Sequence, residues 1–309
     1  MAFKLAIIGL GKIAQDQHLP CVGKNKDFEL AAVVSSRGGY KNVPAFKTPG
    51  ELFASGMKLD AVSLCMPPEP RYAIARQAID AGLHLLLEKP PTPAMGEFEA
   101  LINHAEAAGR IVFTTWHSQY NAAVDEAKQR LAGKTVSRLH IEWKEDVRHW
   151  HPGQEWIWEP GGFGVFDPAI NAFSIVTKIM PQPIFVERAT LLVPANKSTP
   201  IAAQIRFKAS TDRDGDFCAD LDWRQTGEQS WNISVATSDG HELVLRKGGT
   251  ELHVDGKLAL REASEEYERI YAHFAELLIS GKSHIDGAPL QLVSDCFMRG
   301  RHVATDAFA

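Results

Sequence analysis

The sequence predicts an α/β protein in which a doubly wound parallel sheet is followed by an α+β domain with a mostly antiparallel sheet. Three observations predict this fold class. Short apolar runs alternate with helical patterns up to about residue 118, which is typical of parallel strands joined by helices. Beyond that point, strand patterns of alternating polarity dominate. The turn signals Asp239-Gly240 and Asp255-Gly256 in this second half are typical of β-hairpins.

The parallel sheet is expected to occupy a first domain, residues 1–118. Its strands are predicted at 4–8, 30–34, 61–65, 84–87 and 111–115, and its helices from about 13, over 71–81 and over 95–108. Gly82 and Gly109 follow two of these helices and are typical of helix ends. Because parallel strands end at one edge of the sheet, a ligand is expected at their carboxyl ends.

A second domain is expected over residues 119–309. Its strands are predicted at 138–147, 184–193, 201–209, 217–224, 231–237 and 242–246, with helices at 122–131, 168–179 and 265–279. The pattern over about 289–305 predicts a last helix, which is compatible with packing back on the first domain.

Composition argues against several classes of protein. The formal net charge is −5 and there is no long basic run, so nucleic-acid binding is not expected. No apolar stretch approaches the roughly 20 residues that span a bilayer, so no membrane association is expected. The four cysteines are far apart and form no CxxC pair, which favours a reduced, cytoplasmic protein without a structural metal.

The chain begins with a nucleotide-binding pattern. The segment Gly9–Ala14 reads GLGKIA, a G-x-G-x-x-A motif between a predicted strand and a predicted helix. The first glycine allows a tight turn, and Gly11 lets a pyrophosphate approach the backbone at the helix N-terminus. The sequence therefore predicts a Rossmann domain that binds a dinucleotide through Gly9, Gly11, Lys12 and Ile13.

The end of the second predicted strand bears on which cofactor is used. An acidic residue there usually binds the ribose hydroxyls of NAD, but this strand ends in Ser35, Ser36 and Arg37. Hydroxyls and a guanidinium suit the 2′-phosphate of NADP. We therefore expect NADP or NAD as cofactor, with NADP favoured. The alternative is that Arg37 is only a solvated loop residue.

Two further loops follow strands at the same edge. Met66 and Pro67 come after the third strand, where they either border the cofactor or only connect elements. The next strand runs into Glu88, Lys89 and two prolines, so Lys89 is expected beside the nicotinamide and Glu88 at the cofactor site. The alternative for Lys89 is a salt bridge with a nearby acid such as Glu88.

These motifs together resemble the Gfo/Idh/MocA family of sugar and cyclitol oxidoreductases. The resemblance rests on the G-x-G-x-x-A start, the proline loop and the segment Ala81–Pro90, which reads AGLHLLLEKP. It extends over essentially the whole chain and implies a Rossmann domain followed by a mostly antiparallel domain. It also implies a homo-oligomer formed through the C-terminal sheet.

Within that family the chain is similar to bacterial aldose 1-dehydrogenases that act on D-galactose and L-arabinose. The segments 143–154, 156–158 and 164–168 carry this similarity. The family's D-x-x-x-H segment reads Asp167 to Asn171 here, with asparagine in place of the usual histidine. That departure matches the galactose and arabinose subgroup.

The catalytic candidates are Lys89, Asp167 and Asn171. Asp167 precedes Pro168, which by itself is more typical of a helix N-cap, and Asn171 lies one turn further on. The resemblance implies that this helix begins over the nicotinamide, which favours a catalytic interpretation. Asp167 is then the general base, Lys89 stabilises negative charge on the hydroxyl oxygen, and Asn171 holds a sugar hydroxyl.

Three more residues are candidates for sugar binding: His117, Glu145 and Trp150. Each has a structural alternative, since His117 lies at the domain junction, Glu145 could be solvated, and tryptophans are more often core. His149 and His151 could together bind a metal. No third ligand stands at a useful spacing, so no metal site is expected.

The sequence thus predicts an NAD(P)-dependent aldose 1-dehydrogenase that oxidises the anomeric carbon of D-galactose, L-arabinose or both to the lactone. One alternative is another reaction of the same family, on inositol or another sugar. The other is a Rossmann sugar sensor without catalysis, against which Lys89 and Asp167 argue. The sequence does not rank the two sugars, and it does not choose between a dimer and a tetramer.

Overall fold

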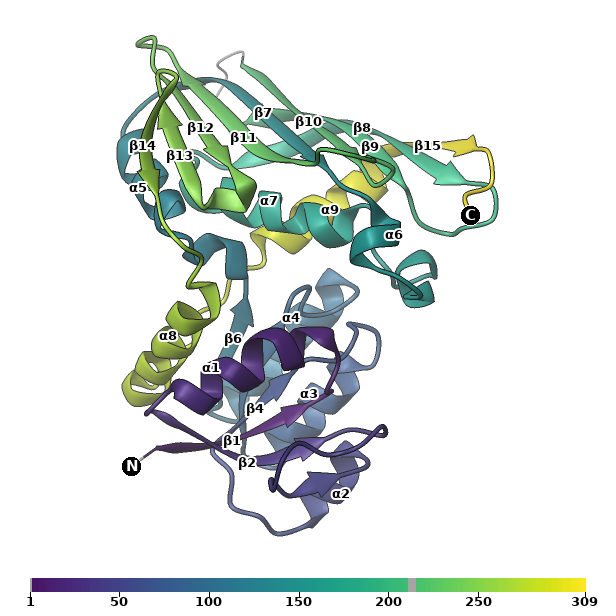
Figure 1. Cartoon of the computed structure of the whole chain (residues 1–309), viewed down its shortest axis with the longest axis vertical. Coiled ribbons are helices and arrows are strands. Elements are labelled where there is room, and N and C mark those ends of the chain that lie inside the picture. The colour runs from purple at the N-terminus through teal and green to yellow at the C-terminus, as the bar shows by residue number, and fades with distance from the viewer. Residues whose placement is uncertain (1, 211–214) are drawn as a thin grey trace. The chain divides into compact units, whose positions relative to one another are not determined.

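The computed structural model describes residues 2–210 and 215–309, which form two compact units (Figure 1). The first unit contains the described residues up to Trp116 together with Glu266–Gly287. The second contains the described residues of His117–Glu265 together with Ala288–Ala309. The chain therefore returns to the first unit late, which differs from the single boundary near residue 118 that the sequence predicts.

The first unit is built on a parallel sheet with strand order β3-β2-β1-β4-β5-β6. The strands are β1 (Phe3–Ile8), β2 (Phe28–Val34), β3 (Ala45–Phe46), β4 (Ala61–Leu64), β5 (His84–Glu88) and β6 (Val112–Thr115). The helices are α1 (Leu19–Lys24), α2 (Pro49–Ala54), α3 (Arg71–Asp80), α4 (Met95–Ala107) and α8 (Glu266–Ser280). A π-helical turn, η1 (Ala14–His18), precedes α1. This arrangement confirms the predicted doubly wound sheet.

The strands of this sheet are nearly continuous apolar runs because both of their faces are covered. Leu85, Leu86 and Leu87 of β5 are all fully buried. Strand order reverses around β1, which has β2 on one side and β4 on the other. In doubly wound sheets the crevice at such a reversal, outside the strand ends, is where ligands bind.

Helix α8 belongs to the first unit although it follows the strands of the second in sequence. Its buried side chains recur three or four residues apart and include Tyr267, Tyr271 and Phe274. The Phe274 ring stacks on Phe28 at 5.7 Å between centroids. The apolar side chains of α8 pack in the core of the first unit. For this reason α8, and not the last helix, belongs to the first unit.

The second unit contains a larger sheet with strand order β14-β13-β12-β11-β7-β10-β9-β8-β15. The strands are β7 (Val136–Lys144), β8 (Ile184–Pro194), β9 (Ala202–Ala209), β10 (Asp216–Asp222), β11 (Ser230–Thr237), β12 (Glu242–Arg246), β13 (Glu251–Val254), β14 (Lys257–Arg261) and β15 (Gly300–Thr305). Only the pairs β10–β7 and β15–β8 are parallel among those described, so the predicted mostly antiparallel sheet is confirmed.

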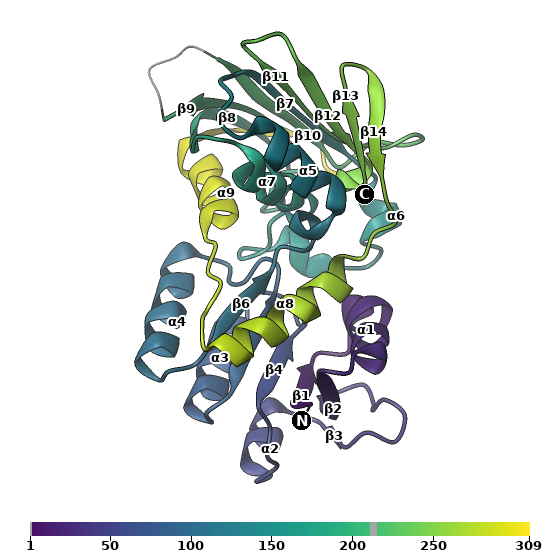
Figure 2. The same ribbon diagram turned by 90° about the vertical axis from the view of Figure 1, so that its left-hand side faces the viewer.

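Helices of the second unit lie on one face of its sheet (Figure 2). They are α5 (Ala122–Leu131), α6 (Val147–Trp150), α7 (Phe166–Ile179) and α9 (Ala288–Arg299), with short 3-10 turns η2 (His117–Tyr120), η3 (Glu155–Trp158) and η4 (Lys247–Gly249). Of these, α5, α7 and α9 cover the sheet. Leu139, Ile141 and Trp143 of β7 point into this core and are buried, whereas His140 and Glu142 face the other way.

The C-terminal segment differs from its predicted form. The helix expected over about 289–305 ends at Arg299, and residues from Gly300 form β15 beside β8. A Cβ at Gly300 would lie 2.4 Å from the carbonyl oxygen of Cys296, so the switch from helix to strand needs a glycine. The segment joins the sheet because β8 offers an edge for backbone hydrogen bonds.

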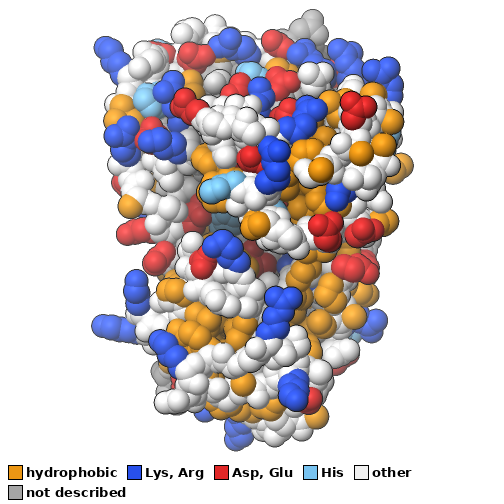
Figure 3. Space-filling model, turned by 45° about the vertical axis from the view of Figure 1, so that its right-hand side comes forward, with side chains coloured by type: hydrophobic (Ala, Val, Ile, Leu, Met, Phe, Trp, Pro, Cys, Tyr) orange, Lys and Arg blue, Asp and Glu red, His pale blue; other side chains and the backbone are white. Residues whose placement is uncertain are grey.

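Charges of both signs are mixed on the face drawn in Figure 3, where Lys and Arg side chains form no continuous patch. Among the residues that the structure describes, no helix is long and apolar enough to span a bilayer.

Candidate active site

The loop after β1 has the geometry that a dinucleotide requires. Gly9 has φ +94°, and a Cβ there would lie 2.8 Å from the backbone nitrogen of Met66. Only glycine therefore lets the loops after β1 and β4 approach so closely. A Cβ on Gly11 would meet nothing within 4 Å, which leaves the backbone open to a pyrophosphate. Lys12 is exposed and pairs with Asp16, while Ile13 is half-buried.

The loop after β2 carries the predicted determinants of cofactor choice. Ser36 and Arg37 are exposed, and Ser35 is half-buried. The Ser35 hydroxyl accepts a hydrogen bond from the Arg37 backbone N–H at 3.1 Å, which shapes the turn. Hydroxyl and guanidinium groups therefore follow β2 at the sequence position where an acid usually binds the ribose of NAD.

A buried arginine joins the next two loops of this edge. Arg71 begins α3 and is only 2% exposed. Its guanidinium donates to the backbone carbonyls of Met66, Glu88 and Pro90. Several donors in a rigid fork can hold the loop after β4 and the loop after β5 together. This role was not predicted, because an arginine that follows a proline loop is usually solvated.

The carboxylate of Glu88 is enclosed by hydrogen-bond donors inside the first unit. Glu88 is 4% exposed at the end of β5. Its Oε1 lies 2.8 Å from His18 Nε2 and accepts from the Tyr267 hydroxyl at 2.7 Å. Its Oε2 accepts from the backbone N–H of Lys89 at 3.0 Å. The position of Lys89 is therefore tied to a buried carboxylate. We call Glu88, His18, Tyr267 and Tyr271 the Glu88 cluster.

His18 is the centre of this cluster. Its Nδ1 lies 2.8 Å from the Tyr271 hydroxyl and 3.2 Å from that of Ser63. Burial by itself lowers the pKa of His18, but the charges and hydrogen bonds around the ring, including those of Cys65 and Glu88, raise the pKa well above its ordinary value. A protonated imidazole follows, so His18 can form a buried ion pair with the Glu88 carboxylate at 2.8 Å.

Helix α7 carries the second group of predicted catalytic residues. It begins at Phe166 with Val165 as N-cap, so Asp167 lies inside the first turn and is not the N-cap that its place before Pro168 suggested. Gly164 has φ +52°, and a Cβ there would lie 2.3 Å from the Pro200 carbonyl oxygen, which fixes the preceding loop. The Asp167 side chain is 6% exposed. The helix N-terminus favours its negative charge.

Two side chains accompany Asp167 in the second unit. His151 Nε2 lies 3.7 Å from Asp167 Oδ2. The Asn171 Oδ1 atom, one turn further along α7, is buried and accepts no hydrogen bond from the residues described. Buried polar atoms of native proteins are nearly always paired, so this oxygen is suited to receive a ligand hydroxyl. His151 was considered only as a metal ligand from the sequence, and its contact with Asp167 was missed.

Glu145 is held by two tryptophans. Its Oε1 accepts from Trp223 Nε1 at 3.0 Å and its Oε2 from Trp231 Nε1 at 2.8 Å. Burial raises the pKa of the Glu145 carboxyl although both indole hydrogen bonds oppose the shift. The structural alternative of a solvated surface residue is therefore wrong. Each carboxylate oxygen has a second lone pair that a sugar hydroxyl can use.

Trp150 and His117 are the remaining predicted sugar contacts. Trp150 is 41% exposed, and its indole N–H donates to Gln229 Oε1 at 2.6 Å. Its ring meets Trp231 edge to face at 5.7 Å. His117 begins η2 and is half-buried, with Nδ1 3.4 Å from the Ser118 hydroxyl. Trp150 thus presents a fixed aromatic surface.

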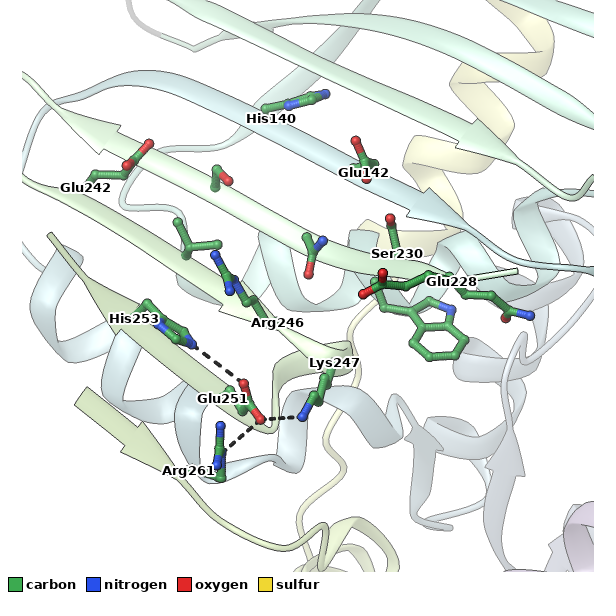
Figure 4. A pocket seen from close by; sticks show the side chains of 15 residues that line it. His140, Glu142, Glu228, Ser230, Glu242, Arg246, Lys247, Glu251, His253 and Arg261 are labelled. Atoms are coloured by element: carbon green, nitrogen blue, oxygen red, sulfur yellow. Dashed lines mark ion pairs between the residues drawn. The ribbon is translucent and has the colours of Figure 1, made fainter. Parts of the chain in front are cut away.

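A separate cavity of about 810 Å³ lies on the sheet face opposite the helices (Figure 4). Within it Glu251 pairs with Lys247 at 2.7 Å, with Arg261 at 2.9 Å and with His253 at 3.6 Å. The cavity contains none of the predicted catalytic residues. Size alone therefore does not identify the catalytic site in this protein.

Known proteins resemble the chain over its whole length. The model of an oxidoreductase family with an NAD-binding Rossmann fold, GFO_IDH_MocA, matches residues 3–116. A galactose 1-dehydrogenase of Pseudomonas fluorescens is 41% identical over 305 residues, which are 99% of this chain and 98% of that protein. The crystal structure of a D-galactose-1-dehydrogenase from Rhizobium etli has a TM-score of 0.95 and 46% identity, and covers 100% of this chain and 98% of that one.

A more distant structure shares the fold alone. It is a 3-ketoreductase from Actinomadura kijaniata, solved in complex with TDP-benzene and NADP, with a TM-score of 0.80 at 16% identity. The match covers 99% of this chain and 100% of that one. The glycine loop after β1, the parallel sheet and the full-length relative at 41% identity lead to one conclusion. The chain belongs to the Gfo/Idh/MocA family of NAD(P)-dependent oxidoreductases.

Proposed function

We propose that the protein is an aldose 1-dehydrogenase that oxidises the anomeric carbon of D-galactose, L-arabinose or both to the lactone. The observation that carries the proposal is Asp167 with Asn171 in the first turns of α7, in a chain 41% identical to a galactose 1-dehydrogenase. The two sugars differ chiefly in one exocyclic hydroxymethyl. Such a group is worth only about 1–3 kcal/mol in a pocket, so one site can accept both.

The proposed chemistry needs one base and one group that stabilises charge. The cofactor, when bound, accepts the hydride from the anomeric carbon. Asp167 takes the proton of the anomeric hydroxyl as general base. Lys89, fixed at its backbone by Glu88, stabilises the negative charge that develops on the oxygen. The buried Oδ1 of Asn171 accepts a hydrogen bond from a neighbouring sugar hydroxyl.

The sugar is held by three further residues in this proposal. Glu145 accepts hydroxyl hydrogen bonds while its two indole donors keep the carboxylate in place. Trp150 offers an aromatic face to the C–H groups of the ring. His117 binds another hydroxyl. These roles use a carboxylate, an aromatic ring and an imidazole, which together suit a neutral polyhydroxy ligand.

We propose NADP as the preferred cofactor, with NAD also accepted. Ser35, Ser36 and Arg37 support this preference because the turn they form carries no acid. The other proposed contacts surround the cofactor along the sheet edge: Gly9, Gly11, Lys12, Ile13, Met66, Pro67, Glu88 and Lys89. Among them the carboxylate of Glu88 faces the interior, so it acts by holding Lys89.

The decisive experiment measures initial rates of NADP and NAD reduction with a panel of aldoses and inositol. Reduction with galactose or arabinose and none with inositol is expected. No reduction with any aldose would refute the proposal, and a high rate with inositol alone would favour the other family reaction. A clear preference for NAD would refute the assignment to Ser35, Ser36 and Arg37. A sugar sensor would bind sugar and cofactor without turnover.

We further propose a homo-oligomer and a cytoplasmic location. Among the described residues, the covering helices α5, α7 and α9 lie on the sheet face opposite the Glu251 cavity (Figure 2), which suits pairing of the cavity face with a second copy. Light scattering after size-exclusion chromatography tests the oligomer, and a monomeric mass would refute it. All four cysteines are free thiols, three of them buried, which suits a reducing compartment.

A further inference from the structure

His151 lies between the proposed base and a recess of the second unit. Its Nε2 is 3.7 Å from Asp167 Oδ2, and the two side chains are 18% and 6% exposed. A cavity of about 500 Å³ lies against His151 and is also lined by Gln154, Glu155 and Lys197. Asp167 does not line that cavity. The imidazole thus reaches the nearly buried carboxylate on one side and a polar opening on the other.

The orientation of the ring suits a proton acceptor facing Asp167. His151 Nδ1 lies 3.5 Å from Gln154 Oε1, an amide oxygen that can only accept a hydrogen bond. In the tautomer that makes this hydrogen bond, Nδ1 carries the proton and Nε2 has a free lone pair toward Asp167. The Trp223 ring lies 5.1 Å from the imidazole and limits its movement.

We propose that His151 carries the proton from Asp167 to solvent in each turnover; this rests on the proposed function. As the anomeric O–H bond breaks, its electron pair forms the C=O bond, hydride leaves the anomeric carbon for the cofactor, and the proton goes to Asp167. The Asp167 carboxylic acid then passes that proton to His151 Nε2. The imidazolium releases its Nδ1 proton to water in the cavity, and transfer of the remaining Nε2 proton to Nδ1 through water restores both the Asp167 carboxylate and the starting tautomer of His151.

The chain needs such a carrier because its second candidate position cannot provide one. Asn171, which occupies the histidine position of the D-x-x-x-H segment, has an amide that does not exchange protons as an acid or base near neutral pH. An imidazole does so readily. The gap of 3.7 Å is longer than a hydrogen bond, and one water or a small ring shift closes it.

The test uses the full-length enzyme with galactose and NADP and compares His151→Ala with wild type. Loss of the carrier is expected to lower kcat about 10- to 100-fold, with the KM for sugar and cofactor changed less than about twofold. Added imidazole should restore kcat in proportion to its concentration, because it can enter the enlarged cavity. The solvent deuterium isotope effect on kcat should rise in the variant as proton release becomes limiting.

Two further variants separate proton transfer from packing. His149→Ala removes an exposed histidine two residues away and should gain nothing from imidazole. His151→Gln keeps a polar side chain but carries no proton, so it should lose kcat like His151→Ala while its thermal unfolding stays near wild type. If His151→Ala does not fold, the kcat of His151→Gln tests the relay, and an undiminished kcat in that variant overturns it.

The outcomes separate the two proposals. If the wild-type enzyme does not reduce the cofactor with any aldose tested, the proposed function itself is refuted. If the wild type is active, a folded His151 variant with undiminished kcat overturns the relay. So does a loss that imidazole leaves unchanged in His151→Ala, because that loss would come from structure.

Discussion

Each unit contains a buried carboxylate among aromatic donors, but the two surroundings differ in how completely they are paired. In the first unit, Glu88 accepts hydrogen bonds from His18, from Tyr267 and from the Lys89 backbone. In the second unit, Glu145 accepts from two indole donors, but Asn171 Oδ1 on α7 is buried and has no partner among the described residues.

This difference suggests different roles for the two groups. The Glu88 cluster is suited to support Lys89, and the residues around Asn171 are suited to bind a ligand. A buried network whose members satisfy one another is rigid, and the Glu88 cluster can hold Lys89 before any ligand arrives. A buried acceptor without a partner costs stability, and a ligand hydroxyl can relieve that cost. The comparison therefore predicts that variants in the first unit lose stability first, whereas variants around Asp167 lose turnover or affinity first.

The largest expected effect is that of Asp167→Asn. Removing the proposed general base should lower kcat about 10²- to 10⁴-fold. The amide has nearly the same shape, so thermal unfolding and NADP binding, followed by fluorescence, should stay close to wild type. A variant with near-normal kcat would mean that another group takes the proton.

Glu88→Gln is the matching change in the first unit. Replacing a buried carboxylate beside His18 should cost about 3 kcal/mol of unfolding free energy, because it leaves the protonated ring without its counter-charge. Chemical denaturation measures the loss, and the exposed Glu106→Gln on α4 is the control. Unchanged stability together with lower kcat would show that Glu88 acts in catalysis and not as a support.

Asn171→Ala should have a smaller effect, and on binding alone. If Oδ1 awaits a sugar hydroxyl, losing it should raise the KM for galactose roughly tenfold, which is about 1.4 kcal/mol. Stability should be unchanged or slightly higher, because an unpaired buried oxygen is removed. A marked drop in the unfolding temperature would place Asn171 with the structural residues instead.

The smallest effect concerns pH. The folded-state pKa of His18 lies above its ordinary value, so the folded protein holds this proton more tightly than the unfolded chain does. That stabilisation is complete below about pH 6.5 and is lost as pH rises through the folded-state pKa, by at most about 1.4 kcal/mol per pH unit. Unfolding of wild type and His18→Gln between pH 6 and 9 should show a difference that shrinks with rising pH. A constant difference would contradict the charged state of His18.

Local sequence predicted much of the fold but missed contacts across long separations. The apolar strands, the glycine turn at Gly9 and the hairpin at Asp255 follow from a few neighbouring residues each. The contact between His18 and Tyr271 joins residues 253 positions apart, and no local sequence pattern predicts it. Helix α8 therefore looked like part of the second domain.

The catalytic candidates were found by motif, and their surroundings were not. Asp167 before Pro168 suggested an N-cap, but proline is tolerated throughout the first helical turn, so the pair does not fix where the helix begins. His151 had no recognisable role until folding brought it to 3.7 Å from Asp167. The role of Arg71 in joining two loops was also not predicted from the sequence.

By itself, the sequence determined the class of each half and the nucleotide loop, because these depend on residue type and short spacing. Asp167 and Asn171 became catalytic candidates only through the resemblance to the Gfo/Idh/MocA family. Tertiary structure alone decided that α8 closes the first unit, that Glu88 holds Lys89 at its backbone, and that His151 lies beside Asp167. The physical reason is that the burial and pairing of polar groups depend on contacts between residues far apart in the sequence. Local sequence patterns do not specify those contacts.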